Sequence, residues 1–210
     1  SFTQAIPGFT ALIVSPKSLT EQWYQECQKW SAHLSFTFYP PIKNMQKDQT
    51  TLQEWSKTGG VAFMTLCSFA LHPCQTDMLV VDEAHLLKNP QTQSYAAVKS
   101  CMTRSKDLTR RKLLLTGSPL QNHLMEYYAM IDLIQPDLFD HATFKSTYAK
   151  VINEGAMADA TDAQIAAAHA KIHLFNRLTN KVVHRKSLAV LATALPNMKE
   201  YKIEIGRAHV

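Results

Sequence analysis

The stretch that decides the fold runs from Asp77 to Asn89 and reads DMLVVDEAHLLKN. Residues 78–81 form a short, uninterrupted apolar run, which is typical of a strand buried on both faces of a parallel sheet. Asp82 and Glu83 follow this run with no spacer. Open α/β sheets bind ligands beyond the carboxyl ends of their strands, and adjacent carboxylates there suit a hard cation and a positioned water. The stretch predicts a nucleotide-hydrolysing site; the plain alternative is an acidic strand end that begins a turn.

The composition of the 210-residue chain is that of an ordinary folded protein. Hydrophobic residues make up 46% and charged residues 19%, which supports a core and is unlike a disordered chain. No apolar run is long enough to cross a bilayer and the first residues show no signal-peptide pattern, so we expect no membrane partner. The net charge of +5 favours a polyanionic partner only weakly, because many enzymes are equally basic.

The cysteines show no pattern of a metal site. Cys27, Cys67, Cys74 and Cys101 form no C-x-x-C pair and no zinc-like spacing with histidine. We interpret them as reduced thiols of an intracellular protein, and we expect Cys67 to lie in a core strand.

Runs of buried-strand character recur along the first two thirds of the chain. They predict strands at residues 11–14, 34–38, 61–66, 78–81 and 112–115. Amphipathic helical patterns separate most of these runs. This alternation predicts an α/β fold with a parallel sheet and right-handed crossovers.

Capping signals mark where the predicted helices begin. Ser18 and Glu21 have the spacing of a capping box at the start of the first helix. The apolar face of that helix carries Trp23, Cys27 and Trp30. We interpret the two tryptophans as core residues; the alternative is a platform on which bases stack. Asn89 and Pro90 predict the start of another helix, and residues 124–134 predict a further one.

From Pro136 onward the pattern becomes helical. Two stretches, residues 142–151 and 160–183, have helical periodicity, and the second contains an Ala-rich run of high helix propensity. We therefore predict a division of the chain into residues 1–135 and 136–204. The remaining residues, 205–210, read IGRAHV, which matches a translated sequencing adapter, so we exclude them from the fold.

Four loops leave the predicted strands in a recognisable order. They are residues 14–19 (VSPKSL), 65–69 (TLCSF), 82–85 (DEAH) and 116–122 (TGSPLQN). Together they resemble motifs Ia, Ib, II and III of the Swi/Snf-type branch of superfamily-two helicase-like ATPases. The TGSPLQN run is the most specific of the four; its plain alternative is a Gly-Pro turn before a helix.

The resemblance implies a RecA-like (P-loop NTPase) lobe, the first of two, followed by a helical protrusion and the start of an inter-lobe linker in residues 136–204. Residues 126–128 and 182–186 resemble the ATRX-like subgroup most closely, although His184 stands where many members have Arg. The implied function is ATP hydrolysis coupled to movement on double-stranded DNA in chromatin remodelling. The implied partners are nucleosomes or DNA-bound proteins, and the implied location is the nucleus.

The resemblance also implies a role for each motif residue. Asp82 would hold the Mg²⁺ ion of bound ATP, and Glu83 would orient the attacking water. Residues of motifs II and III would couple the nucleotide state to the lobe interface: His85, Thr116, Gly117, Ser118 and Gln121. For His85 the alternative is a histidine that packs locally at a helix start.

Phosphate contacts to DNA are implied for Ser15, Lys17 and Ser18, which offer charge and short hydroxyls but no base readout. For Lys17 the alternative is an ordinary solvated lysine. Residues 99–112 contain a basic cluster, made of Lys99, Arg104, Lys106, Arg110, Arg111 and Lys112. This cluster would add a patch that faces the phosphates. The alternative is a solvated connection between a helix and a strand.

One expected motif does not occur within the 210 residues: G-x-x-x-x-G-K-[ST], the phosphate-binding loop. We expect that loop before residue 1 and a second RecA-like lobe after residue 210, so that this chain is an interior piece of a longer protein and hydrolyses no ATP by itself. Two other functions stay open from the sequence. One is a strand-separating DNA or RNA helicase, and the other is a catalytically dead lobe that serves as a binding scaffold.

Overall fold

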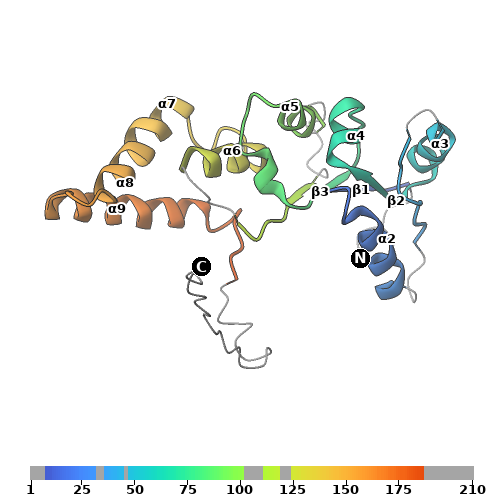
Figure 1. Ribbon diagram of the computed structural model, residues 1–210, viewed down its shortest axis with the longest axis horizontal. Coiled ribbons are helices and arrows are strands. Elements are labelled where there is room, and N and C mark those ends of the chain that lie inside the picture. The colour runs from blue at the N-terminus through green and yellow to red at the C-terminus, as the bar shows by residue number, and fades with distance from the viewer. Residues whose placement is uncertain (1–7, 32–35, 45–46, 102–110, 119–123, 187–210) are drawn as a thin grey trace, which may run out of the picture.

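The structure, a computed structural model, describes residues 8–31, 36–44, 47–101, 111–118 and 124–186. Its centre is a sheet of parallel strands in the order β2-β1-β3-β4 (Figure 1). The strands are β1 (Thr10–Ser15), β2 (Gly60–Thr65), β3 (Met78–Val81) and β4 (Arg111–Leu114). The predicted parallel α/β fold is therefore confirmed.

Helices connect and follow these strands. The α-helices are α2 (Thr20–Trp30), α3 (Gln49–Thr58), α4 (Leu66–Leu71), α5 (Gln93–Ser100), α6 (Leu124–Ile134), α7 (His141–Phe144), α8 (Lys150–Gly155) and α9 (Asp162–Thr179). A 3-10 helix, η1 (Ala84–Leu87), follows β3, and a π-helical turn, η2 (Lys145–Ala149), joins α7 to α8. None of the described helices is both long and apolar enough to cross a membrane.

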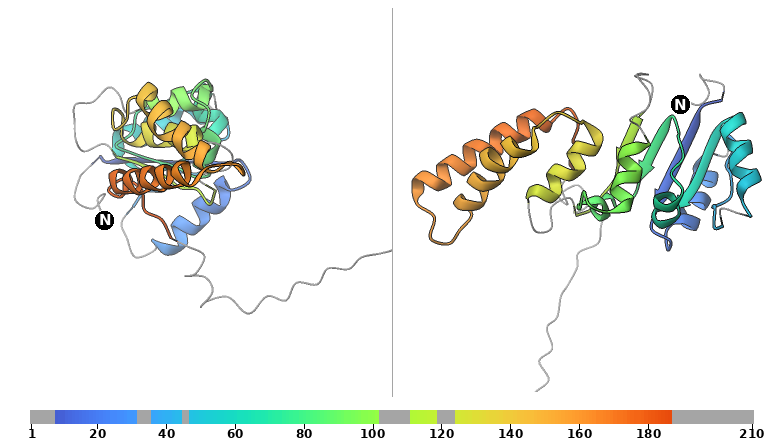
Figure 2. Two further views of the ribbon diagram at one scale, coloured as in Figure 1. Left: turned by 90° about the vertical axis from the view of Figure 1, so that its left-hand side faces the viewer. Right: turned by 90° about the horizontal axis from the view of Figure 1, so that it is seen from above.

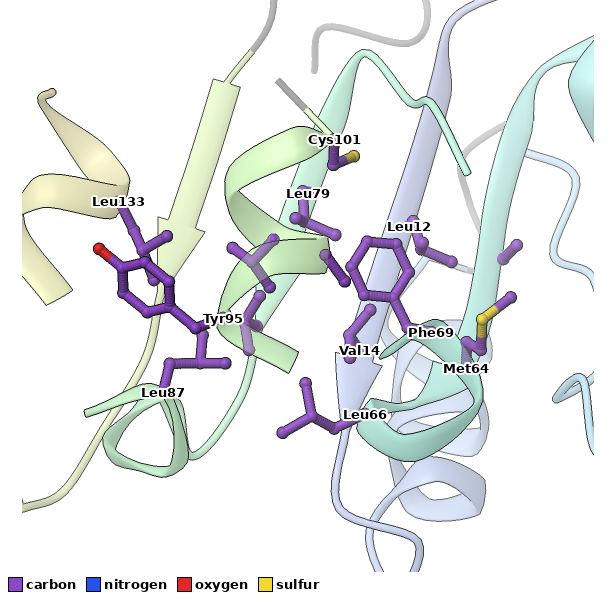
Figure 3. Packing of buried hydrophobic residues seen from close by; sticks show 14 of the residues in the cluster. Leu12, Val14, Met64, Leu66, Phe69, Leu79, Leu87, Tyr95, Cys101 and Leu133 are labelled. Carbon is purple, nitrogen blue, oxygen red and sulfur yellow. The ribbon is translucent and has the colours of Figure 1, made fainter. Parts of the chain in front are cut away.

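The two faces of the sheet are covered by different helices. Successive side chains of a strand point to opposite faces, so Leu12 and Val14 of β1 lie on one face and Ile13 on the other. The first face packs against α4 and α5, with Phe69 and Tyr95 above the strands (Figure 3). The second face packs against α2. Burial on both faces explains why these strands read as continuous apolar runs.

The helical part has an apolar core of its own. Aromatic side chains from α6, from the segment before α7 and from α7 to α9 form it: Tyr128, Phe139, Phe144, Tyr148 and Phe175. In Figure 2 this helical group extends away from one end of the sheet, with α6 between the two parts. Helix α6 serves both cores, because Ala129 and Leu133 face the sheet cluster whereas Tyr128 and Ile131 face the aromatic cluster. The division of the chain near residue 136 remains a prediction.

Two predicted helix starts are wrong. Helix α5 begins at Gln93, and the hydroxyl of Thr92 caps it by accepting a hydrogen bond from the Tyr95 N–H. Asn89 instead accepts the N–H of Gln91, which forms a turn before the helix. Helix α2 begins at Thr20 with Leu19 at the N-cap position and no side-chain capping bond, so Ser18 does not cap it.

Three further details differ from the prediction. Of the strand predicted at residues 34–38, residues 34 and 35 lie outside the described part, and Phe38 makes only an isolated bridge to Val61. Cys67 is exposed on helix α4 rather than buried in a strand. Trp30 is 69% exposed at the end of α2 and is not a core residue.

Candidate active site

The polar loops meet at the carboxyl edge of the sheet because all the paired strands run in the same direction. The Asp82 N–H donates to the Val14 carbonyl at 2.8 Å, and the Leu115 N–H donates to the Val81 carbonyl at 2.9 Å. These bonds align the ends of β1, β3 and β4. Asp82 and Thr116 consequently lie at the same edge of the sheet.

Both carboxylate oxygens of Asp82 accept hydrogen bonds, one from the next residue and one from a distant helix. Oδ1 accepts the Glu83 N–H at 2.9 Å, and Oδ2 accepts the indole Nε1–H of Trp23 at 2.8 Å. The side chain is partly buried. Two donors from different elements thus fix the orientation of this carboxylate.

Glu83 turns the chain away from the sheet in an unusual backbone conformation. Its φ and ψ are 50° and 46°, the left-handed region that non-glycine residues rarely adopt. The next residue, Ala84, donates its N–H to the Leu115 carbonyl at 2.8 Å, which anchors the turn to the end of β4. Such strain is concentrated at functional sites, where the surrounding structure holds it in place.

His85 connects the acidic pair to the loop after β4. Its Nδ1 lies 3.1 Å from Oε2 of Glu83 and 3.3 Å from Oγ1 of Thr116. The Thr116 hydroxyl also accepts the Ser118 N–H at 3.1 Å, which shapes the turn at Gly117. Gly117 and Ser118 are exposed. Gln121 lies outside the described residues.

The loop after β1 presents only part of its predicted DNA-contacting set. Lys17 and Ser18 are exposed, but Ser15 is 1% exposed. Thr20 donates its hydroxyl proton to the Pro16 carbonyl, and the Ser15 hydroxyl lies 3.0 Å from the Thr20 hydroxyl. Ser15 is therefore buried as a brace for the loop, and its burial argues against a phosphate contact.

Of the predicted basic cluster, the structure describes Lys99, Arg111 and Lys112. Lys99 pairs with Asp132 at 2.8 Å, and Lys112 donates to the Leu133 carbonyl at 2.7 Å. Burial lowers the pKa of Lys112. Both lysines thus bind α6 rather than form an open phosphate-facing patch, while Arg104, Lys106 and Arg110 lie outside the described residues.

The oxygen donors at this edge fit a magnesium ion that arrives with a nucleotide. Within the described ranges no cluster of three or more His, Cys, Asp or Glu side chains could hold a metal alone. Proteins usually bind Mg²⁺ through one or two carboxylates together with substrate phosphates. Asp82 and Glu83 provide such a partial set of hard ligands.

Sequence reasoning missed two features of this site. The helical pattern predicts a packed position for Trp23, which the structure shows, but it gives no sign that the indole N–H reaches Asp82 across 59 positions of sequence. The left-handed turn at Glu83 was also not predicted, because non-glycine residues give no sequence signal for it. The one sequence signal that points to a role of Trp23 near the site is its position in the helix that follows the loop of residues 15–18.

Comparison with known proteins identifies the family to which this chain belongs. The model of the SNF2-related domain matches residues 6–209. The chain belongs to the SNF2-related domain family. The match includes most of residues 205–210, for which an adapter origin remains a prediction.

Relatives of the chain carry names from transcriptional regulation and from DNA repair. The ATRX homolog of Caenorhabditis elegans is 29% identical over 92% of this chain, and human ATRX is 27% identical over 93%. A RAD54-like DNA repair and recombination protein of Drosophila erecta is 29% identical over 89%. This SNF2-related chain spans only 17%, 9% and 24% of the lengths of these three relatives.

A solved structure shows the same fold. The SWI2/SNF2 ATPase core of Sulfolobus solfataricus, determined in complex with double-stranded DNA, matches with a TM-score of 0.63 at 20% sequence identity. The match covers 88% of this chain and 35% of the other. The sheet and helices described above thus share the fold of part of that structure.

Proposed function

We propose that this chain contributes nucleotide- and DNA-contacting elements to an ATP-dependent translocase that moves on double-stranded DNA and remodels chromatin. The observation that carries the proposal is the convergence of Asp82, Glu83, His85 and Thr116 at one edge of the sheet. Membership of the SNF2-related family supports it. The similar solved structure, which was determined with double-stranded DNA, also supports it, as do the names of the relatives, a transcriptional regulator and a DNA repair and recombination protein.

In the proposed mechanism Asp82 would hold a magnesium ion that binds with ATP, and the chemistry supplied by such an ion would be neutralisation of charge on the phosphates. Glu83 orients the attacking water. Because His85 engages Oε2 of Glu83, the other carboxylate oxygen is left to accept a hydrogen bond from that water. The imidazole thus positions the carboxylate that polarises the nucleophile.

The contact between His85 and Thr116 suggests how the nucleotide state reaches the rest of the protein. A shift of Glu83 upon hydrolysis would move His85 and, through it, the exposed Thr116–Ser118 turn. In this proposal the turn and Gln121 transmit the change to a second RecA-like lobe. Lys17 and Ser18 contact a DNA phosphate, which gives affinity without base specificity. We place the complete protein in the nucleus, with nucleosomes or DNA-bound proteins as partners.

The test is the ATPase activity of the full-length protein with double-stranded DNA. Glu83→Gln removes the charge that polarises the water, so we expect the turnover rate to fall about 100-fold or more. Glu154→Gln is the matched control, because Glu154 pairs with Lys150 on the surface of α8, away from the sheet edge. An unchanged rate for Glu83→Gln would contradict the proposed role.

A second measurement separates translocation from strand separation. A translocase displaces a DNA-bound protein or a third strand without opening the duplex. We therefore expect ATP-dependent displacement of a triplex-forming strand and no release of a strand from a duplex. Duplex unwinding would favour the strand-separating helicase, and absence of both activities in an ATP-binding protein would favour the scaffold.

A further inference from the structure

The hydrogen bond between Trp23 and Asp82 joins two loops that the proposed function assigns to different ligands. Trp23 lies on α2, which begins directly after the loop carrying Lys17 and Ser18. Asp82 lies at the end of β3. The indole Nε1–H and the carboxylate Oδ2 are 2.8 Å apart.

The indole ring is held by its surroundings rather than by this bond alone. Trp23 packs on the second face of the sheet, against the cluster of Ile13, Phe63 and Val80. An indole N–H is a donor only, so it can neither accept a proton nor bind a metal. It therefore acts on Asp82 only as a hydrogen-bond donor, and this bond fixes the direction in which the carboxylate points.

The path from the loop to the carboxylate is continuous. The Pro16 carbonyl accepts the N–H of Leu19 at 2.9 Å and the hydroxyl of Thr20 at 3.0 Å. The Leu19 carbonyl in turn accepts the Trp23 N–H at 2.9 Å. A displacement of the loop would thus move the first turn of α2 and the indole that holds Asp82.

We propose that Trp23 is a positioning residue for Asp82 and that it couples occupancy of the Lys17–Ser18 loop by DNA to metal–nucleotide binding. The inference rests on the proposed function, which gives Asp82 its metal and the loop its phosphate. The alternative is that Trp23 only fills space beneath the sheet. A filling role requires the ring but not its N–H.

Trp30 provides a matched control on the same helix. Its Nε1–H donates to Oε2 of Glu26 at 2.7 Å, so it also forms an indole–carboxylate bond. However, Trp30 is 69% exposed and its bond lies within one helix. Trp23→Phe and Trp30→Phe therefore remove the same chemical group, and only the first removes a contact with the site.

The bond itself is tested by nuclear magnetic resonance of the ¹⁵N-labelled 210-residue chain, without nucleotide. We expect Asp82→Asn to shift the indole signal of Trp23 and to leave that of Trp30 in place. Glu26→Gln should do the reverse. A Trp23 indole signal that does not respond to Asp82→Asn would overturn the proposal at its first step.

The consequence is tested by binding of Mn²⁺, as a probe for Mg²⁺, to the full-length protein with a non-hydrolysable ATP analogue. Electron paramagnetic resonance measures the free ion. We expect Trp23→Phe to weaken Mn²⁺ binding about tenfold, as loss of a bond that orients a metal ligand commonly does. Trp30→Phe should match the wild type. Thermal unfolding of both variants sets a temperature at which each is folded.

A DNA duplex added to the same assay tests the coupling. In the wild type and in Trp30→Phe we expect the duplex to tighten Mn²⁺–nucleotide binding, and in Trp23→Phe we expect this effect to disappear. If the wild type binds Mn²⁺ with the nucleotide and the duplex tightens this binding equally in Trp23→Phe, the inference is overturned and the proposed function stays intact. Absence of Mn²⁺–nucleotide binding in the wild type would instead overturn the proposed function.

Discussion

The sheet region and the helical region of this chain are stabilised by different kinds of core. The sheet core is largely aliphatic, with Leu12, Val14, Leu79 and Val81 fully buried between strands and helices. The helical core is aromatic, and the Phe144 ring lies 4.9–5.8 Å from four other aromatic rings. The difference teaches that the strands gain their burial from regular pairing between segments distant in sequence, whereas the helical region depends on a few large aromatic side chains.

The largest expected effect is on the aromatic core. Phe144 is fully buried, so Phe144→Ala should lower the free energy of unfolding of the helical region by about 3–5 kcal/mol through lost burial and a cavity. Hydrogen exchange measured by mass spectrometry should show faster exchange in α7 to α9 and unchanged protection in β1 and β3.

Leu79→Ala is the counterpart in the sheet, because Leu79 is also fully buried. We expect a cost of about 2–5 kcal/mol with faster exchange in the strands. If Phe144→Ala removes protection from β1 and β3 as strongly as Leu79→Ala does, the two regions form one cooperative unit and the contrast between them fails.

A smaller effect is expected where the two regions meet at α6. Asp132 accepts hydrogen bonds from Tyr95 at 2.7 Å and from Lys99 at 2.8 Å, both from α5. Burial by itself would raise the pKa of Asp132, but these two donors outweigh it and the pKa is lowered. At neutral pH we expect Asp132→Asn to destabilise the chain by about 1–2 kcal/mol, because it weakens hydrogen bonds to a charged acceptor.

The lowered pKa fixes the direction of the pH dependence. The unfolded chain takes up the proton at an ordinary pKa of about 4, and the folded chain takes it up only at lower pH. The stabilisation that ionised Asp132 gives the folded chain is therefore complete above about pH 4. It is lost as the pH falls through the pKa of Asp132 in the folded chain. Urea unfolding at several pH values should show the difference between wild type and Asp132→Asn shrinking below about pH 4. A constant difference would contradict this account.

The smallest effect concerns two threonine caps, one in each region. Thr161 forms a capping box with Gln164 at the start of α9, and Thr92 caps α5 against the sheet. We expect Thr161→Ala and Thr92→Ala each to cost about 1 kcal/mol. Hydrogen exchange should increase in the first turn of α9 for one variant and of α5 for the other. Spread of either effect into the opposite region would argue against separate cores.

Much of the sheet could be predicted because its signals are local. The run MLVV followed by two acids predicts a central strand with a polar end, and β3 and Asp82 lie accordingly. Helix α6 was predicted with the bounds that the structure shows. The prediction failed where a neighbour in space decides the outcome. Thr92, not Asn89, caps α5, and Trp30 lies in solvent although it shares a helical face with Trp23.

The sequence by itself determined the strand and helix types, the parallel order of motifs and the acidic pair, because periodicity and adjacency are properties of the chain. Only the tertiary structure decided that Ser15 is buried, that His85 lies between Glu83 and Thr116, and that Trp23 holds Asp82. These contacts join residues on separate elements. Their distances follow from strand register and helix packing, which no short stretch of sequence specifies.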